Sequence, residues 1–119
     1  MKHNSDFRYD LSIGVQKEKQ LALILGDNCT IEVKYDRYKN DRFFIEYKYD
    51  DGQKSYNTGL STTQADYYAL AKSTYFFLIK TSVLKDKVRL FAKNNKPVRG
   101  GDNNTAIGFL VPISFLVSL

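Results

Sequence analysis

Cysteine, histidine, proline and tryptophan are scarce in this chain of 119 residues, which has one Cys, one His, two Pro and no Trp. The single thiol, Cys29, permits no internal disulfide, and this favours a reducing compartment. With His3 as the sole imidazole, the chain lacks the Cys and His ligands of a usual zinc site.

Long apolar runs are also missing. Residues 1–12 are mostly polar, have no apolar core of the signal-peptide type, and are expected to be extended. Residues 107–119 form an apolar C-terminal segment, but Pro112 interrupts it and it is too short to cross a bilayer as a helix. We therefore expect a cytoplasmic protein that does not enter a membrane.

The remaining composition is that of a globular protein with a basic surface. The apolar fraction is 43% and the charged fraction is 26%, with nine Tyr and eight Phe. This length suits one domain, expected to span residues 1–119. The net charge of +5 favours a polyanionic partner such as nucleic acid.

Hydrophobic periodicity and turn residues predict a mixed α/β order. Apolar side chains at helical spacing indicate a helix that Gly26 ends. A hydroxyl followed three residues later by Gln64 resembles a capping box, so a helix is expected to begin near Ser61. The expected order is a helix at 15–25, strands at 30–35, 43–49 and 54–58, a helix at 61–73, a buried strand at 74–81, a helix at 82–91, a loop at 93–105 and a final strand at 107–119.

Two of these strands, 30–35 and 43–49, are expected to form a hairpin closed by the polar segment 36–42. Side chains alternate along a strand, so Lys34 and Asp36 should share one face, as should Glu46 and Lys48. Asp36 would then lie opposite Glu46 and form a carboxylate pair for a hard divalent cation. The alternative is the solvated face of an ordinary antiparallel sheet.

This order, together with the D…E-x-K pattern of Asp36, Glu46 and Lys48, resembles the PD-(D/E)XK nuclease superfamily. Glu18 stands where many members carry a further metal-binding glutamate. Gln64 and Tyr68 look like the Q-x-x-x-Y motif of one branch of the superfamily. The segments IEVKYD, FFIEY, TGLSTTQADYY and the late GGD are similar to small phage-encoded nucleases of the superfamily.

The resemblance implies a restriction-endonuclease-like core, with a mixed central sheet flanked by helices in α-β-β-β-α-β order. It also implies Mg²⁺-dependent hydrolysis of DNA, with Mn²⁺ as a substitute metal, in phage recombination, repair or degradation in the host cytoplasm. Glu18, Asp36 and Glu46 would hold the metal, and the carbonyl of Tyr47 would be a further ligand. Lys48 would position the attacking water.

Several assignments remain open at this stage. The chain also contains Glu32-Val33-Lys34 as a second E-x-K, and Lys34 is the alternative to Lys48 because the lysine migrates between strands in this superfamily. Gln64 and Tyr68 would support the metal ligands, or simply cap and pack a helix. The basic residues expected to contact DNA phosphates are Arg42, Lys54, Lys72, Lys80, Lys85, Lys87, Arg89 and Arg99.

Two other functions fit the same sequence. One is a catalytically inactive nucleic-acid-binding protein with the same fold. The other is a small interaction protein that uses the apolar segment 107–119. An exposed apolar strand is prone to aggregate, so we expect this segment to be covered by the first helix or by the same strand of a second subunit in a homodimer.

Overall fold

The structure, a computed structural model, describes residues 29–118 and is an α/β fold with one mixed and one antiparallel sheet. The described residues divide into two units, one built from residues 29–39 with Ala65–Thr81, the other from Asn40–Gln64 with residues 82–118. No helix within the described residues is long and apolar enough to span a membrane.

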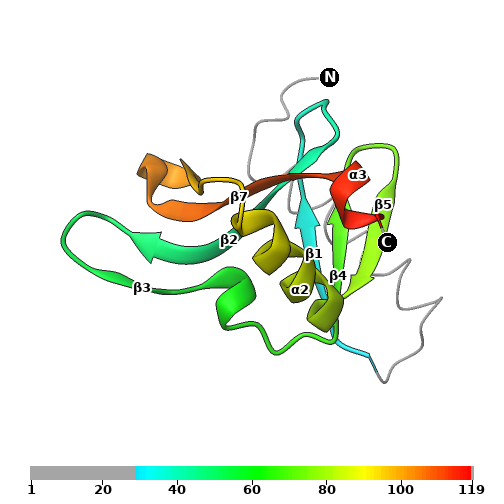
Figure 1. Ribbon diagram of the computed structural model, residues 1–119, viewed down its shortest axis with the longest axis horizontal. Helices are drawn as coiled ribbons and strands as arrows, with labels where there is room; N and C mark the ends of the chain where they lie inside the picture. The colour runs from blue at the N-terminus through cyan, green and yellow to red at the C-terminus, as the bar shows by residue number, and fades with distance from the viewer. Residues whose placement is uncertain (1–28, 119) are drawn as a thin grey trace. The chain divides into compact units, whose positions relative to one another are not determined.

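The first unit contains a three-stranded sheet in the order β1-β4-β5 (Figure 1). The central strand β4 (Tyr67–Ala71) pairs in parallel with β1 (Ile31–Tyr35) and antiparallel with β5 (Phe76–Lys80). With neighbours on both edges, β4 is buried from Tyr68 to Ala71. Its Tyr68 and Leu70 side chains therefore pack in a core, and neither lies on a solvent-exposed face of the sheet.

The second unit contains a four-stranded antiparallel sheet in the order β3-β2-β7-β6. Its longest strand, β2, is next to β7 along nearly its whole length. The strands are β2 (Arg42–Asp50), β3 (Ser55–Asn57), β6 (Val98–Gly100) and β7 (Ala106–Pro112).

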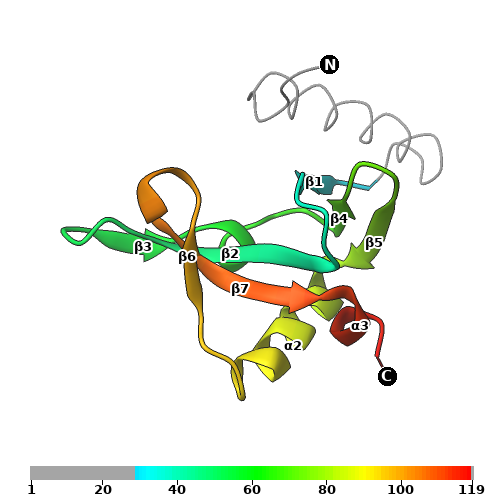
Figure 2. The same cartoon turned by 90° about the horizontal axis from the view of Figure 1, so that it is seen from above.

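Helices cover one side of this second sheet. Figure 2 shows α2 (Thr81–Ala92) and α3 (Ile113–Leu116) on the same side of it. The ring of Phe91 in α2 meets Phe109 of β7 edge-on at 6.2 Å and Phe115 of α3 at 5.1 Å between centroids. These aromatic contacts bury the apolar stripe of α2.

The predicted helix at 61–73 is wrong. A short 3₁₀ helix, η1 (Gly59–Ser61), comes first, and the Ala-rich segment that follows forms β4. Alanine favours helices, but helix propensity is weak compared with burial between two neighbouring strands. The strand 74–81 is confirmed as β5, although only Ile79 of it is buried, and the helix 82–91 is confirmed as α2.

The predicted hairpin between 30–35 and 43–49 is also wrong. Both segments are strands, but β1 pairs with β4 whereas β2 pairs with β3 and β7. The tight hairpin forms one connection later, where Asp50, Asp51 and Gly52 join β2 to β3. Gly52 has φ +92°, a conformation that glycine adopts at little cost.

The apolar segment 107–119 becomes a strand and a short helix. Pro112 ends β7 and precedes the first turn of α3, as expected for a residue without an N–H group. On one edge β7 pairs with β2, and on the other edge residues 106–108 pair with β6. This intramolecular pairing covers much of the strand, so the reason for expecting a homodimer is weaker.

Candidate functional site

Asp36 occupies the carboxyl end of β1. Its backbone N–H donates to the carbonyl oxygen of Ala71 at 2.8 Å, which extends the parallel pairing of Tyr35 with Ala71. Lys72 follows Ala71 directly, so the two charged residues leave their strands side by side. The carboxyl end of parallel strands is where α/β proteins commonly place functional groups.

The carboxylate of Asp36 contacts a buried ammonium. The Lys72 Nζ lies 3.2 Å from Asp36 Oδ2, and the two side chains are 6% and 17% exposed. Lys72 also donates to the carbonyl oxygen of Tyr38 at 3.2 Å, and the Tyr38 N–H donates to Asp36 Oδ1 at 2.9 Å. In this poorly hydrated setting each charge depends on the other.

Lys34, the alternative catalytic lysine, belongs to a separate pair on β1. Its Nζ lies 3.4 Å from Glu32 Oε2, and both side chains are about half exposed. Their contact agrees with the predicted period-two alternation along this strand. The structure therefore pairs Lys34 with Glu32, and pairs Asp36 with Lys72.

Glu46 lies in a β-bulge of β2. The register with β7 shifts between Glu46 and Lys48, which adds one residue to β2 at this point. The Thr58 hydroxyl donates to Glu46 Oε2 at 2.7 Å, which fixes the half-buried carboxylate. Bulges of this kind are common next to active sites because they redirect side chains.

Two glycines allow this backbone geometry. A Cβ on Gly108 would lie 2.3 Å from the carbonyl oxygen of Ile45, and a Cβ on Gly59 would lie 2.2 Å from that of Glu46. Gly59 also has φ +53°. Only glycine fits at these two positions, where the backbone of Gly108 lies against the Ile45 carbonyl and that of Gly59 against the Glu46 carbonyl.

Lys48 does not share a face with Glu46, so this expectation is wrong. Glu46 is opposite Gly108 whereas Lys48 is opposite Ile107, and consecutive residues of β7 lie on opposite faces. Phe109, on the same face as Ile107, contacts α2 through Phe91. The bulge thus turns Lys48 toward the helical side of the sheet and Glu46 away from it.

The carbonyl of Tyr47 is a poor metal ligand, contrary to the expectation. It accepts hydrogen bonds from the N–H of Thr58 at 3.1 Å and from the Ser61 hydroxyl at 2.8 Å. A carbonyl oxygen has two lone pairs, and both are used here. Tyr47 instead stacks its ring on Phe109, with centroids 5.5 Å apart.

The expected supporting residues do not share a helix. Tyr68 is a core residue of β4, 2% exposed, whereas Gln64 is exposed and precedes that strand. Glu18, the third expected metal ligand, lies outside the described residues. Within residues 29–118, no three His, Cys, Asp or Glu side chains lie close enough together to hold a metal ion.

The basic residues expected to contact DNA have diverse surroundings. Lys72 is only 5% exposed and ion-paired, so it cannot serve as a surface phosphate contact. Arg89 pairs with Asp86, Arg99 with Asp50, and Lys87 donates to the carbonyl oxygen of Ser118. Exposed or half-exposed positions are occupied by Arg42, Lys54, Lys80, Lys85, Lys87, Arg89 and Arg99.

Sequence reasoning missed two features. It counted Lys72 among the surface cations, although a lysine directly after the apolar run Tyr67–Ala71 is a signal for a strand end. It also passed over Arg37-Tyr38-Lys39, where an aromatic residue stands between two cations.

No protein-family model, curated protein or solved structure matches the chain.

Proposed function

We propose that this protein is a metal-dependent nuclease that hydrolyses phosphodiester bonds of DNA. The D…E-x-K resemblance provides the hypothesis, with Asp36 and Glu46 as the metal-binding carboxylates and Glu18 as a further ligand. The observation that carries it is the constrained Asp36 carboxylate beside the buried ammonium of Lys72, at 3.2 Å. A carboxylate held in one orientation is a suitable ligand for the metal that such hydrolysis uses.

Each of the two carboxylates, taken singly, has the oxygen chemistry that a hard cation needs. Ionised carboxyl groups have about four acceptor positions between their two oxygens. Asp36 uses one on each oxygen, for Lys72 and for the Tyr38 N–H, and Glu46 uses one for Thr58. The remaining positions are hard oxygen ligands of the kind that Mg²⁺ prefers.

The chemistry divides between the metal and the side chains. A bound Mg²⁺ would acidify water and offset charge on the phosphate oxygens. Lys72 and the Tyr38 N–H hold the Asp36 carboxylate in one orientation, with one contact on each of its oxygens. The Thr58 hydroxyl holds one oxygen of Glu46 and so fixes the direction in which the other points.

The restriction-endonuclease-like core belongs to this proposal as well. The order of β1, β2 and β3 along the chain supports it, although β1 belongs to another sheet than β2 and β3. The strand β4 stands in place of the next helix. An experimental structure with Mg²⁺ and a DNA substrate would decide whether the core is of this type.

A cleavage panel tests the activity. Linear duplex, single-stranded and branched DNA, with RNA for comparison, are incubated with the protein in Mg²⁺, in Mn²⁺ and in EDTA. We expect cleavage with either metal and none in EDTA. Glu46→Gln should lower the cleavage rate by about 10²–10³-fold, whereas Glu32→Gln, the same change at a half-exposed carboxylate, should leave it unchanged. Metal-independent cleavage, or wild-type turnover by Glu46→Gln, would overturn the proposal.

A second candidate function is favoured by the position of Lys48. Because the bulge separates Lys48 from Glu46, the E-x-K lysine is not on the side of the sheet where the glutamate lies. A nucleic-acid-binding protein without catalysis would tolerate this separation. In the same panel such a protein would bind DNA with no cleavage under any metal condition.

A further inference from the structure

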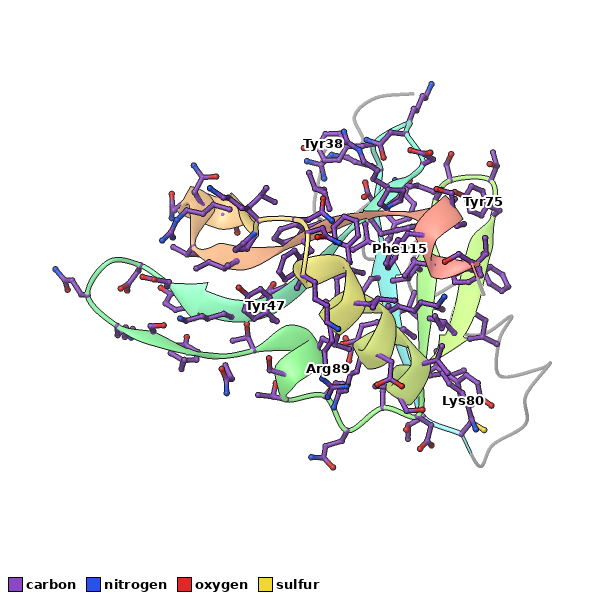
Figure 3. All side chains as sticks on the ribbon, in the orientation of Figure 1. Tyr38, Tyr47, Tyr75, Lys80, Arg89 and Phe115 are labelled. Carbon is purple, nitrogen blue, oxygen red and sulfur yellow. The ribbon has the colours of Figure 1, made fainter. Side chains whose placement is uncertain are left out.

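The loop that follows β1 exposes a large aromatic ring. Tyr38 is 64% exposed, the highest value among the exposed large hydrophobic residues of the described chain. Figure 3 labels it on the loop beyond β1. Large aromatic side chains usually bury much of their surface, so a strongly exposed one indicates a binding role more than a packing role.

The backbone of Tyr38 is held in place although its side chain is exposed. Its N–H donates to Asp36 Oδ1 at 2.9 Å, and its carbonyl oxygen accepts from Lys72 Nζ at 3.2 Å. Both partners belong to the buried ion pair described above. The ring therefore projects from a fixed point, and ordering this loop on binding costs little conformational entropy.

Two cations flank Tyr38 in the sequence. The guanidinium carbon of Arg37 lies 5.5 Å from the Tyr38 ring centroid, a cation–π distance. Lys39, the next residue, is also exposed. An exposed aromatic residue with a cation on either side of it in the chain combines the groups that bind a base by stacking and its neighbouring phosphates by charge.

We propose that Arg37, Tyr38 and Lys39 form a contact for single-stranded nucleic acid, in which an unstacked base lies on the Tyr38 ring. Arg37 covers one face of the ring, and the other takes the base. A paired duplex keeps its bases stacked inside, so single strands or unpaired ends are the ligand class. This inference adds a class of ligand to the proposed nuclease function, and it rests on that proposal's assignment of nucleic acid as the partner.

Binding is measured in EDTA, so that cleavage plays no part. A single-stranded oligodeoxynucleotide containing 2-aminopurine is titrated with the full chain, and both anisotropy and 2-aminopurine quenching are followed. Tyr38→Ala should weaken binding about ten-fold and remove the quenching, the size expected for one lost base stack. Tyr38→Phe should bind like the wild type, because stacking needs the ring and not the hydroxyl.

Matched variants separate stacking from general effects. Tyr75→Ala removes another exposed tyrosine of the same unit, 39% exposed, and should leave binding unchanged. Lys39→Ala should lower the slope of log affinity against log salt by about 0.7, as for one phosphate contact on a single strand. The far-ultraviolet circular dichroism of every variant should match the wild type, since Tyr38 makes its described hydrogen bonds through its backbone.

Wild-type affinity in Tyr38→Ala, equal losses in Tyr38→Phe and Tyr38→Ala, or equally Tyr38-dependent binding of a blunt duplex would overturn the inference. Tyr38-dependent binding without cleavage in any metal would overturn the nuclease and leave this contact standing. Cleavage unaffected by Tyr38→Ala, with unchanged affinity, would overturn the contact and leave the nuclease. A wild-type chain that binds no oligonucleotide overturns both.

Discussion

The ammonium of Lys72 and the carboxylate of Asp36, 3.2 Å apart and largely removed from water, form the most buried ion pair described in residues 29–118. Each group leaves the carboxyl end of one of two parallel strands. A pair in this environment is costly to break from one side, since the remaining charge stays buried and loses its counter-charge. The stability of the first unit should therefore be sensitive to either residue.

Lys72→Met should lower the free energy of unfolding by about 3–5 kcal/mol, because it leaves the Asp36 carboxylate without its counter-charge. The double change Asp36→Asn with Lys72→Met should cost less than the sum of the two single changes. Urea unfolding midpoints give these values. Lys34→Ala, which breaks the exposed pair with Glu32, is the control and should cost less than about 1 kcal/mol. Equal losses in Lys72→Met and Lys34→Ala would contradict the buried pair.

Lys48→Ala should retain most of any cleavage activity, since Lys48 faces the helical side of its sheet and Glu46 faces the other side. Glu46→Gln should lower the rate by about 10²–10³-fold, as for a lost electrostatic contact in the transition state. Single-turnover rates at saturating Mg²⁺ provide the comparison. If Lys48→Ala proves as inactive as Glu46→Gln, the lysine acts despite the bulge.

Gly108→Ala should destabilise the second sheet severely, by about 4 kcal/mol or more, because the added methyl would overlap the Ile45 carbonyl at 2.3 Å. Gly52→Ala is the matched control: nothing lies within 4 Å of the new Cβ, and only φ +92° is unfavourable. That variant should cost about 1–3 kcal/mol. Thermal unfolding of the two proteins tests the ranking, and a milder effect at Gly108 would refute the close approach.

The hairpin between β2 and β3 should weaken in acid. The backbone N–H groups of Lys54 and Gln53 donate to Asp51 and hold the pKa of its carboxyl below the ordinary 3.8. Because the folded pKa is the lower one, this contribution is complete above the unfolded value and disappears as pH falls through the folded value. The protection factors of the Gln53 and Lys54 amides, corrected for the pH dependence of intrinsic exchange, should fall over that range. Asp51→Asn should remove the pH dependence, and its persistence would assign the effect to another group.

Local patterns were sufficient for several elements of this fold. Alternating β-formers predicted β1 and β2, the Asp50–Gly52 turn predicted the step to β3, and the apolar spacing around Leu84 and Val88 predicted α2. In each of these cases the residues that determine the element are neighbours in the chain. The pairing partner of each strand could not be predicted in this way, because it depends on segments that are distant in the sequence.

The arrangement of the candidate site could not be predicted from local sequence patterns. Period-two counting placed Lys48 beside Glu46, but one inserted residue in β2 reverses the direction of every later side chain. Gly59 and Gly108 carry the local signal of that close backbone approach. The contact of Asp36 with Lys72 has no such signal, because it follows from a parallel pairing between β1 and β4 that neither segment encodes alone.

Neither unit is a continuous piece of chain: β2 and β3 belong to one sheet, yet they lie in the sequence between β1 and β4 of the other. Two hairpins, β2–β3 and β4–β5, can form quickly from local contacts. The pairing of β2 with β7 must close a loop of about sixty residues, and that of β1 with β4 a loop of about thirty-five. We therefore expect slow, strongly coupled folding in which a cut between the strands of one sheet also prevents assembly of the other.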